Sequence, residues 1–396
     1  MSEEISLLKG VLSHLASNPI SSRGRMYKEK EDPTRTAFQR DRDRIIHSSA
    51  FRRLKYKTQV FVYYEGDNYR TRLSHSLEVA QIARSICRFL GLNEDLTETL
   101  ALAHDLGHTC FGHAGEDALK ECMKLYRGFD HNVQTFRILT EIEHPYPDFD
   151  GLNLTWETLE GLVKHNGPYK TDSNSQSIQL VFSDYSKRQD LELSNFPSAE
   201  AQIAAIADDI AYNAHDIDDG LRADLFTIDD LFSISLIGPI AQKVEKDYGH
   251  IQKSRRVHEI VRRLIKTMVN DVISETISRN KKFSPLDKEM VHRLDKSIVG
   301  FSKKMSLEEK ELKSFLLTNM YRHDKVNRMT SRATVIVQDL FEFFFDQPNL
   351  IPNTLGRKNH NNNFDKASLV SDYIALMTDR FAIEEHNRIF DRKENI

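Results

Sequence analysis

Along most of this 396-residue chain, apolar residues recur at steps of three and four, the spacing of one face of an α-helix. The pattern is clearest over residues 77–90, where Gly91 follows as a typical C-terminal cap. Alternating runs typical of strands are scarce, and residues 59–64 are the candidate for a short hairpin arm. The periodicity therefore predicts an all-α fold. Further helices are expected over residues 95–106, 132–142, 156–165, 201–211, 257–273, 335–345 and 369–383, with another opened by a capping box at 306–309.

The length allows two or three domains, or one large helical body, at roughly 150 residues per domain. The chain has no internal repeat and no clear interdomain linker, so we expect one compact body with a C-terminal helical extension. Polar stretches at 171–177 and 359–363 are expected to be loops. The predicted regions are an N-terminal segment, a core that carries the chemistry, and a C-terminal helical region packed on that core, at 1–33, 34–225 and 226–396.

Composition excludes several classes of protein. The chain is 39% hydrophobic and 29% charged, as ordinary globular proteins are. No apolar run approaches the roughly 18 residues that span a bilayer, and residues 1–8 lack the pattern of a secretory signal. Cys87, Cys110 and Cys122 form no Cys-x-x-Cys pair, which argues against a disulfide framework and against a cysteine zinc site. We therefore expect a cytoplasmic protein with free thiols and no membrane association.

The formal net charge of −4 conceals a basic segment. Residues 34–72 contain ten lysines or arginines and four acidic residues, a local charge of +6, so the rest of the chain carries −10. Such a segment favours a polyanionic partner, which is either nucleic acid or a small phosphate ester. The alternative is a basic surface that faces solvent.

Histidines paired with carboxylates are the main candidates for chemistry. His75 lies just inside the first expected helix, and His104-Asp105 lies at the C-terminal end of the second. Imidazole and carboxylate together suit divalent zinc, iron, manganese or magnesium. A His-Asp pair is weak evidence by itself, because the chain contains two others. These are His215-Asp216 and His323-Asp324.

The segment that follows Asp105 strengthens the case for this pair. Residues 106–116 contain three glycines and two further histidines. Because glycine lets the backbone turn sharply and approach a ligand closely, we expect His108, His113 and Glu116 to converge near the metal.

A further ligand is expected from residues 208–209. On a helix, Asp208, Tyr212 and residues 215–216 share one face, whereas Asp209 points roughly 100° away. Carboxylates on an alanine-rich helix are costly to bury unless they are paired or bound to metal. One of the two aspartates is therefore a ligand and the other supports it. Pairing of Asp209 with an arginine is the alternative for that residue.

Seven ordered motifs resemble those of one known family, the deoxyguanosine triphosphate triphosphohydrolase group of the HD superfamily. The vertebrate SAM-and-HD-domain dNTP hydrolase is similar to a lesser degree. The motifs lie at residues 35–48, 51–61, 70–79, 104–116, 129–134, 208–212 and 372–379, so the resemblance covers nearly the whole chain. It implies an HD-domain helical fold with a C-terminal helical extension. The near absence of an insertion before residue 129 indicates the shorter branch of the family.

Matched motif by motif, the resemblance assigns the metal to His75, His104, Asp105 and Asp208. It places four further residues near the scissile bond: His108, His113, Glu116 and His131. Some members have asparagine at the position of His108 and glycine at that of His131, so the general acid or base differs among members.

Substrate contacts are expected from the basic segment and from the helix that carries Asp208. Arginine binds phosphate by paired hydrogen bonds, which makes Arg72, Arg53 and Arg35 candidates for the triphosphate. Gln59 and Tyr212 are candidates for the sugar, and Asp216 is expected in the same substrate site. For each arginine, a structural salt bridge to an aspartate is the alternative. The aspartates concerned are Asp41, Asp43 and Asp216.

The reaction that the resemblance implies converts a dNTP, either dGTP or dNTPs more broadly, to the deoxynucleoside and inorganic triphosphate. The expected cofactor is Mn²⁺ or Mg²⁺, with iron, nickel, cobalt or zinc as alternatives. Relatives also imply a dNTP activator and a homo-oligomer such as a hexamer. Competing hypotheses are another HD-type nucleotide phosphohydrolase, a nucleic-acid-binding protein, and a regulatory subunit with a degenerate site. The intact ligand set argues against the last of these. Binding of single-stranded nucleic acid is a further alternative, as an accessory property.

Overall fold

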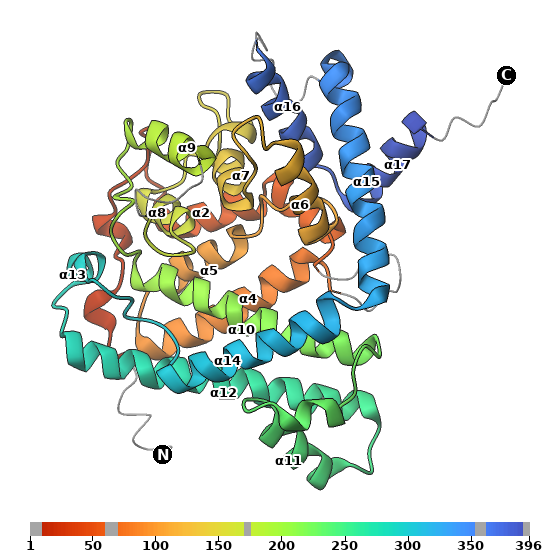
Figure 1. The fold of residues 1–396 in the computed structure, drawn as a ribbon. Helices are drawn as coiled ribbons and strands as arrows, with labels where there is room; N and C mark the ends of the chain where they lie inside the picture. The colour runs from red at the N-terminus through yellow and green to blue at the C-terminus, as the bar shows by residue number, and fades with distance from the viewer. Residues whose placement is uncertain (1–9, 60–69, 170–175, 353–361, 391–396) are drawn as a thin grey trace. The chain divides into compact units, whose positions relative to one another are not determined.

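The computed structural model describes residues 10–59, 70–169, 176–352 and 362–390, and these ranges contain many helices and no strand (Figure 1). Two isolated bridges pair Arg25 with Thr155 and Thr58 with Thr71. The prediction of an all-α fold is confirmed. No helix in the described ranges combines the length and the apolar character that a membrane crossing needs.

The chain divides into two compact units, each assembled from segments that are far apart in the sequence. The first unit consists of residues 1–18, 77–101 and 196–327, and the second consists of residues 19–76, 102–195 and 328–396. The domain limits at residues 33 and 225 expected from the sequence stay a prediction.

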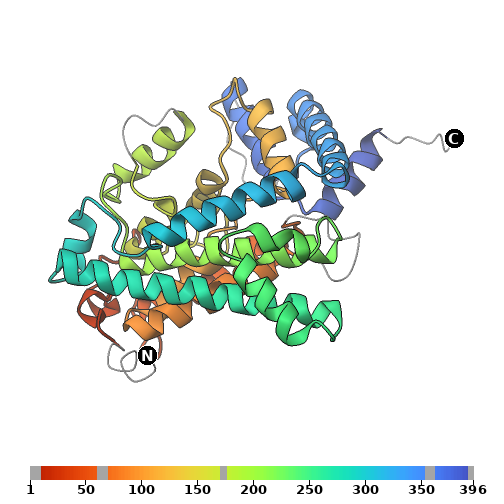
Figure 2. The same cartoon turned by 60° about the horizontal axis from the view of Figure 1, so that its bottom comes forward.

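In the first unit, α10 (Ala199–Arg222) packs along both α12 (Lys253–Phe283) and α14 (Lys303–Leu316), as Figures 1 and 2 show. Buried alanines on α10 let the neighbouring helices approach closely. The buried face of α12 repeats the apolar spacing seen in the sequence. The unit also contains residues 77–90 of α4 (Arg72–Leu90), residues 94–101 of α5 (Glu94–Ala103), α11 (Gly238–Tyr248), α13 (Lys288–Arg293) and the π-helical turn η7 (Leu317–Tyr321).

The second unit carries the glycine-rich segment and the C-terminal helices. Its helices are α2 (Ala37–Ile46), α3 (Ser49–Arg53), α6 (Gly112–Cys122), α7 (His131–Arg137), α8 (Trp156–Val163), α9 (Gln176–Ser186), most of α15 (Asp324–Asp346), α16 (Asn363–Ala375) and α17 (Asp379–Phe390). A π-helical turn, η5 (Ile138–Ile142), extends α7.

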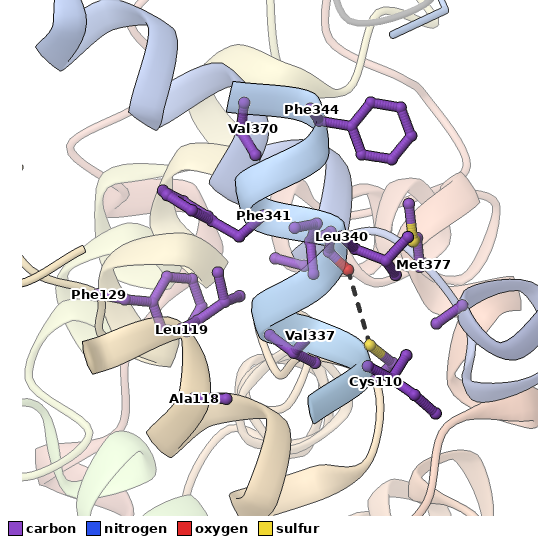
Figure 3. Packing of buried hydrophobic residues seen from close by; sticks show 14 of the residues in the cluster. Cys110, Ala118, Leu119, Phe129, Val337, Leu340, Phe341, Phe344, Val370 and Met377 are labelled. Carbon is purple, nitrogen blue, oxygen red and sulfur yellow. Dashed lines mark hydrogen bonds between the residues drawn. The ribbon is translucent and has the colours of Figure 1, made fainter. Parts of the chain in front are cut away.

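An apolar cluster joins α6, α15 and α16 in this unit (Figure 3). Leu119 of α6 and Val337, Leu340 and Phe344 of α15 are all fully buried. Cys110, just before α6, points its sulfur at the carbonyl of Ile374 at the end of α16, at 4.0 Å. The C-terminal helices are therefore packed directly on the segment that the sequence singled out for chemistry.

Two helix boundaries expected from the sequence are wrong. The stretch 369–383 is two helices, because α16 ends at Ala375 and α17 begins at Asp379. The hydroxyl of Thr378 accepts a hydrogen bond from the amide of Phe381 and so caps α17. The capping box at 306–309 is also wrong, because Ser302 caps α14 by accepting a hydrogen bond from the amide of Met305.

Several expectations fall wholly or partly outside the described residues. The expected hairpin arm at 59–64 lies outside the described residues except for Gln59. Most of the expected loops at 171–177 and 359–363 lies outside them as well. Residues 176–177 belong to α9, and Asn362 caps α16 through the amide of Asp365. The other helices expected from the sequence are confirmed. Most of their ends are displaced by a few residues, whereas α10, α12 and α15 extend about ten residues beyond the expected limits.

Truncating Phe344 to alanine is expected to lower the free energy of unfolding by about 3–5 kcal/mol, because the fully buried ring leaves a cavity. Val335 lies on the same helix and is 52% exposed, so Val335→Ala should change stability by no more than about 0.5 kcal/mol. Denaturant unfolding of the two variants measures both values. Equal effects would contradict the assignment of the cluster as a core.

Candidate metal centre and active site

The first cluster of candidate ligands consists of His75, His104 and Asp105, all at most 6% exposed. His75 lies in the first turn of α4, and His104 and Asp105 follow the end of α5. Each residue offers one ligand atom, and these atoms lie within 4.8 Å of one another. The Nε2 atoms of His75 and His104 are 3.9 and 3.4 Å from the Asp105 carboxylate. Two imidazoles and a carboxylate, buried and convergent, fit a divalent metal.

Asp105 is held by a buried arginine. The Nη1 atom of Arg72 donates a hydrogen bond to Oδ2 of Asp105 at 2.9 Å. Burial alone raises the pKa of Asp105, but the charges of Arg72, His104 and His108 outweigh burial and hold that pKa well below its ordinary value. The carboxylate is therefore ionised at neutral pH, which is the form that binds metal.

A second cluster surrounds Glu116, which is 2% exposed. Its carboxylate lies 2.9 Å from Nδ1 of His131, 3.6 Å from Nδ1 of His108 and 3.9 Å from Nδ1 of His113. The rings of His108 and His131 stack with centroids 4.0 Å apart. We call these four residues the Glu116 cluster. The convergence of His108, His113 and Glu116 that the sequence predicts is confirmed, and His131 joins them.

The two clusters are joined through His108. Its Nε2 atom lies 3.2 Å from Oδ1 of Asp105, while its Nδ1 atom faces Glu116. Burial, together with the charges of Arg72 and His131, lowers the pKa of His108 well below its ordinary value. Burial raises the pKa of Glu116, but its hydrogen bond to His131 and the neighbouring charges outweigh burial and lower that pKa. The site thus offers a neutral imidazole beside a carboxylate anion, which is the pairing that proton transfer requires.

Glycines bring these clusters together by packing backbone on backbone. A β-carbon on Gly107 would lie 2.1 Å from the carbonyl oxygen of His131. A β-carbon on Gly115 would lie 2.0 Å from the carbonyl oxygen of Cys110. The sequence predicts that these glycines let the backbone approach a ligand, but at these two positions the close neighbour is the chain's own backbone.

The basic segment is largely buried or paired with acids, which argues against a basic face open to solvent. Arg72 is 1% exposed and bound to Asp105. Arg35 binds Asp32 and Asp43 at 2.7 and 2.9 Å, and its side chain is 48% exposed. Gln59 is 4% exposed. A β-carbon placed on Gly112 would lie 3.1 Å from the backbone carbonyl oxygen of Gln59. Arg35 and Arg72 therefore lie in ion pairs, as the structural alternative proposed, although the partner of Arg72 is Asp105.

Arg53 lies in a different part of the second unit. Its guanidinium is 3.8 Å from Glu143, and burial lowers its pKa. It lines a cavity of about 390 Å³ together with Tyr373, Met377 and Phe381. No histidine of the two clusters lines this cavity. A triphosphate contact for Arg53 or Arg35 stays a prediction.

In the first unit, the predicted substrate residues Tyr212 and Asp216 are linked through a tyrosine that the sequence analysis missed. The hydroxyl of Tyr321 donates a hydrogen bond to Asp216 at 2.5 Å and forms another with the hydroxyl of Tyr212. Burial, then the charge of Asp216, raises the pKa of Tyr321 well above its ordinary value. Tyr321 is the last residue of the π-helical turn η7, and such turns are frequent at functional sites. No residue spacing in the sequence predicts this turn.

Residues 208 and 209 are neighbouring aspartates on α10. Asp209 pairs with Lys313 at 2.9 Å, so its partner is a lysine where an arginine was the expected alternative. Asp208 lies on α10 in the first unit. Its assignment as the fourth metal ligand stays a prediction from the resemblance.

Comparison with known proteins agrees with this chemistry. The HD domain family matches residues 72–213, and the phosphohydrolase-associated domain matches residues 299–388. A protein of Parvibaculum lavamentivorans is 57% identical over 95% of this chain and 96% of its own length. Proteins of Caulobacter sp. (strain K31) and Brucella canis are 54% and 55% identical, over 95% and 96% of this chain and equal shares of their own.

All three relatives are called deoxyguanosinetriphosphate triphosphohydrolase-like proteins. This chain is more than 50% identical to each relative across nearly its full length, so the match covers the whole fold and not a single domain. The family that the seven motifs indicated is confirmed. The chain belongs to the deoxyguanosinetriphosphate triphosphohydrolase-like family and is an HD-domain phosphohydrolase.

Proposed function

We propose that this phosphohydrolase converts a deoxynucleoside triphosphate into the deoxynucleoside and inorganic triphosphate with the help of a divalent metal. The observation that carries the proposal is the position of Asp105, which contacts both histidines of the first cluster and also His108 of the second. A site for a metal and a site for proton transfer are thereby joined at one carboxylate. This is the arrangement that hydrolysis of a phosphate ester needs.

His75, His104 and Asp105 would hold the metal, with Asp208 as the proposed fourth ligand. The metal, proposed to be Mn²⁺ or Mg²⁺, would supply a Lewis acid for a phosphoryl oxygen and for water. Arg72 lies beside Asp105 and is proposed to contact the phosphates, because its guanidinium presents donors beyond the one that Asp105 accepts.

In the proposed reaction, water attacks the α-phosphorus and the bond from phosphorus to the 5′ oxygen breaks. A neutral imidazole of the Glu116 cluster accepts a proton from the attacking water, and an imidazolium returns one to the 5′ oxygen. His108 and His131 are the favoured candidates, because both face the Glu116 carboxylate, which stabilises the imidazolium. His113 is 52% exposed at its side chain, and a role at the mouth of the site suits it better.

From the resemblance, Gln59 and Tyr212 are proposed to contact the sugar, with Asp216 in the same substrate site. Within the first unit, Tyr321 donates to Asp216 and is hydrogen-bonded to the hydroxyl of Tyr212, which supports the positions of these two side chains. The relatives' names contain deoxyguanosine triphosphate, which supports dGTP as one substrate. An activating dNTP, a homo-oligomer and a cytoplasmic location stay predictions.

Incubation of the purified chain with each of the four dNTPs, with Mn²⁺ or Mg²⁺, tests the proposed reaction. Separation of the products by anion exchange is expected to show deoxynucleoside and inorganic triphosphate in equal amounts. Release of pyrophosphate or orthophosphate as the primary product would overturn the reaction assignment. So would hydrolysis confined to nucleoside monophosphates or cyclic nucleotides.

A further inference from the structure

The motif at residues 372–379 marks the break between α16 and α17, and its last residue is completely buried. Asp379 is 0% exposed. Its carboxylate accepts hydrogen bonds from the amide of Phe111 at 2.9 Å, from the amide of Thr58 at 3.0 Å and from the hydroxyl of Thr58. A residue near the C-terminal end of the chain thus bonds directly to the segment that contains the Glu116 cluster.

A buried lysine makes a second connection to the same segment. Lys57 is 1% exposed, and its Nζ atom donates to the carbonyl oxygens of His108 at 2.5 Å and Ala375 at 2.7 Å. Ala375 is the last residue of α16, so its carbonyl has no partner within that helix. The ammonium group of Lys57 therefore donates hydrogen bonds both to the end of α16 and to the backbone of His108, a proposed catalytic residue.

The backbone between these two contacts is strained. Phe111 has φ of 61° and Gly112 has φ of 58°, and a left-handed conformation is unfavourable for phenylalanine. Cys110, between the two contacts, is fully buried against α16 (Figure 3). The loop 108–111 is therefore held at its first residue by Lys57, at its last by Asp379 and in between by packing.

We propose that Lys57 and Asp379 are positioning residues that fix the loop 108–111, so that His108 keeps its contacts with both Asp105 and Glu116. The proposal rests on the proposed function for its kinetic consequence. It gives the C-terminal motif a role in the active site, although that motif contributes no group to either cluster.

The electrostatics of the two residues agree with a specific role. Burial, then the charge of Arg53, lowers the pKa of Lys57 to about 7, and burial raises the pKa of Asp379. Burying a charged group costs folding free energy unless hydrogen bonds satisfy the group. Apolar side chains would fill the same space without that cost, but they would not hold the loop by its backbone.

Asp379→Asn and Lys57→Met test the proposal in the full-length chain. In Asp379→Asn, the amide nitrogen replaces one carboxylate oxygen, so it faces either the amide of Phe111 or the two donors of Thr58. In Lys57→Met, the carbonyl oxygens of His108 and Ala375 lose their partner. We expect kcat to fall about 10- to 100-fold, the range for supporting contacts of this kind, while KM and metal affinity change less than about twofold. Asp339→Asn is the matched control. It removes the negative charge on α15 that lies 2.7 Å from Nε2 of His386, and it should leave kcat unchanged.

Hydrogen exchange gives a readout that does not depend on substrate. The Phe111 amide is bonded to Asp379, so peptides that cover residues 104–116 should exchange faster in Asp379→Asn than in the parent chain or in Asp339→Asn. Thr58→Val removes only the hydroxyl donor and should show a smaller effect of the same kind, which keeps the test valid if Asp379→Asn fails to fold.

Unchanged kcat in a folded Lys57 or Asp379 variant would overturn the proposal. A parallel loss of kcat, metal affinity and melting temperature would also overturn it, because that result is the mark of a general loss of stability. If the parent chain hydrolyses no dNTP, the proposed function fails, whereas the exchange of residues 104–116 still decides whether Asp379 fixes the loop.

Discussion

The variant His75→Ala is expected to lose divalent metal binding and to reduce dNTP hydrolysis about 1,000-fold or more. A metal contributes several kcal/mol to stabilising a phosphoryl transition state, and about 1.4 kcal/mol corresponds to a tenfold change in rate. His75 is one of only three residues in the first cluster and is 1% exposed, so no nearby solvent molecule replaces it easily. Metal content of the dialysed protein and kcat measured with added Mn²⁺ test the two expectations.

His75 is a better choice than Asp105 for this test. Asp105→Ala would remove a proposed ligand. It would also leave the buried guanidinium of Arg72 without its carboxylate, which costs about 3–5 kcal/mol of stability. His75→Ala leaves the contact between Arg72 and Asp105 in place. Asp184→Ala, which removes an exposed carboxylate elsewhere in the second unit, is the control and should retain metal and activity. Full metal content and activity in His75→Ala would refute the metal site.

Glu116→Gln is expected to lower kcat by about 100- to 1,000-fold, because a general acid or base contributes about 10²–10⁴ and depends on its orienting partner. The amide keeps the size of the side chain, but it carries no charge to stabilise an imidazolium on His131 or His108. Metal binding at His75, His104 and Asp105 should persist, since Glu116 belongs to the other group of possible ligands, with His108 and His131. Steady-state kinetics, together with metal analysis, separate this result from that of His75→Ala.

Asp117 provides a matched control on the same helix. The Asp117 side chain is 79% exposed, and its carboxylate lies 4.0 Å from the ammonium group of Lys120. Asp117→Asn should therefore leave kcat unchanged. A Glu116→Gln protein with the parent kcat would show that the Glu116 cluster takes no part in proton transfer. A protein that also lost its metal would show that the two clusters are one site.

The sequence predicted the helices well because their apolar spacing is a local property. It failed at residues 376–378, where a single apolar pattern continues across a break. At that break, Thr378 caps α17 and Asp379 bonds to Thr58 and Phe111, residues more than 260 positions away, so the local pattern does not reveal it. It also misplaced the cap of α14, since Ser302 and Ser306 are equivalent by residue type and only the hydrogen bond to Met305 distinguishes them.

The histidines and carboxylates of the site were predictable because each lies in a motif. The partners of the basic segment were not. Arg72, Arg53 and Lys57 look alike in the sequence, but one binds Asp105, one faces Glu143 and one is buried against two carbonyl groups. Tyr321 was missed for a related reason. It lies in a π-helical turn about a hundred residues from the side chains it contacts, and no local pattern reveals such a contact.

The hydrogen bond from the amide of Phe111 to Asp379 has a consequence for folding during synthesis on the ribosome. The two residues are 268 positions apart, and synthesis at about 5–20 residues per second places roughly 13 to 54 seconds between them. Throughout that interval, the strained loop beside His108 exists without the carboxylate that holds it. The nascent chain can therefore build most of its helices early, but the loop 108–111 gains its contact with Asp379 only after the start of α17 has been synthesised.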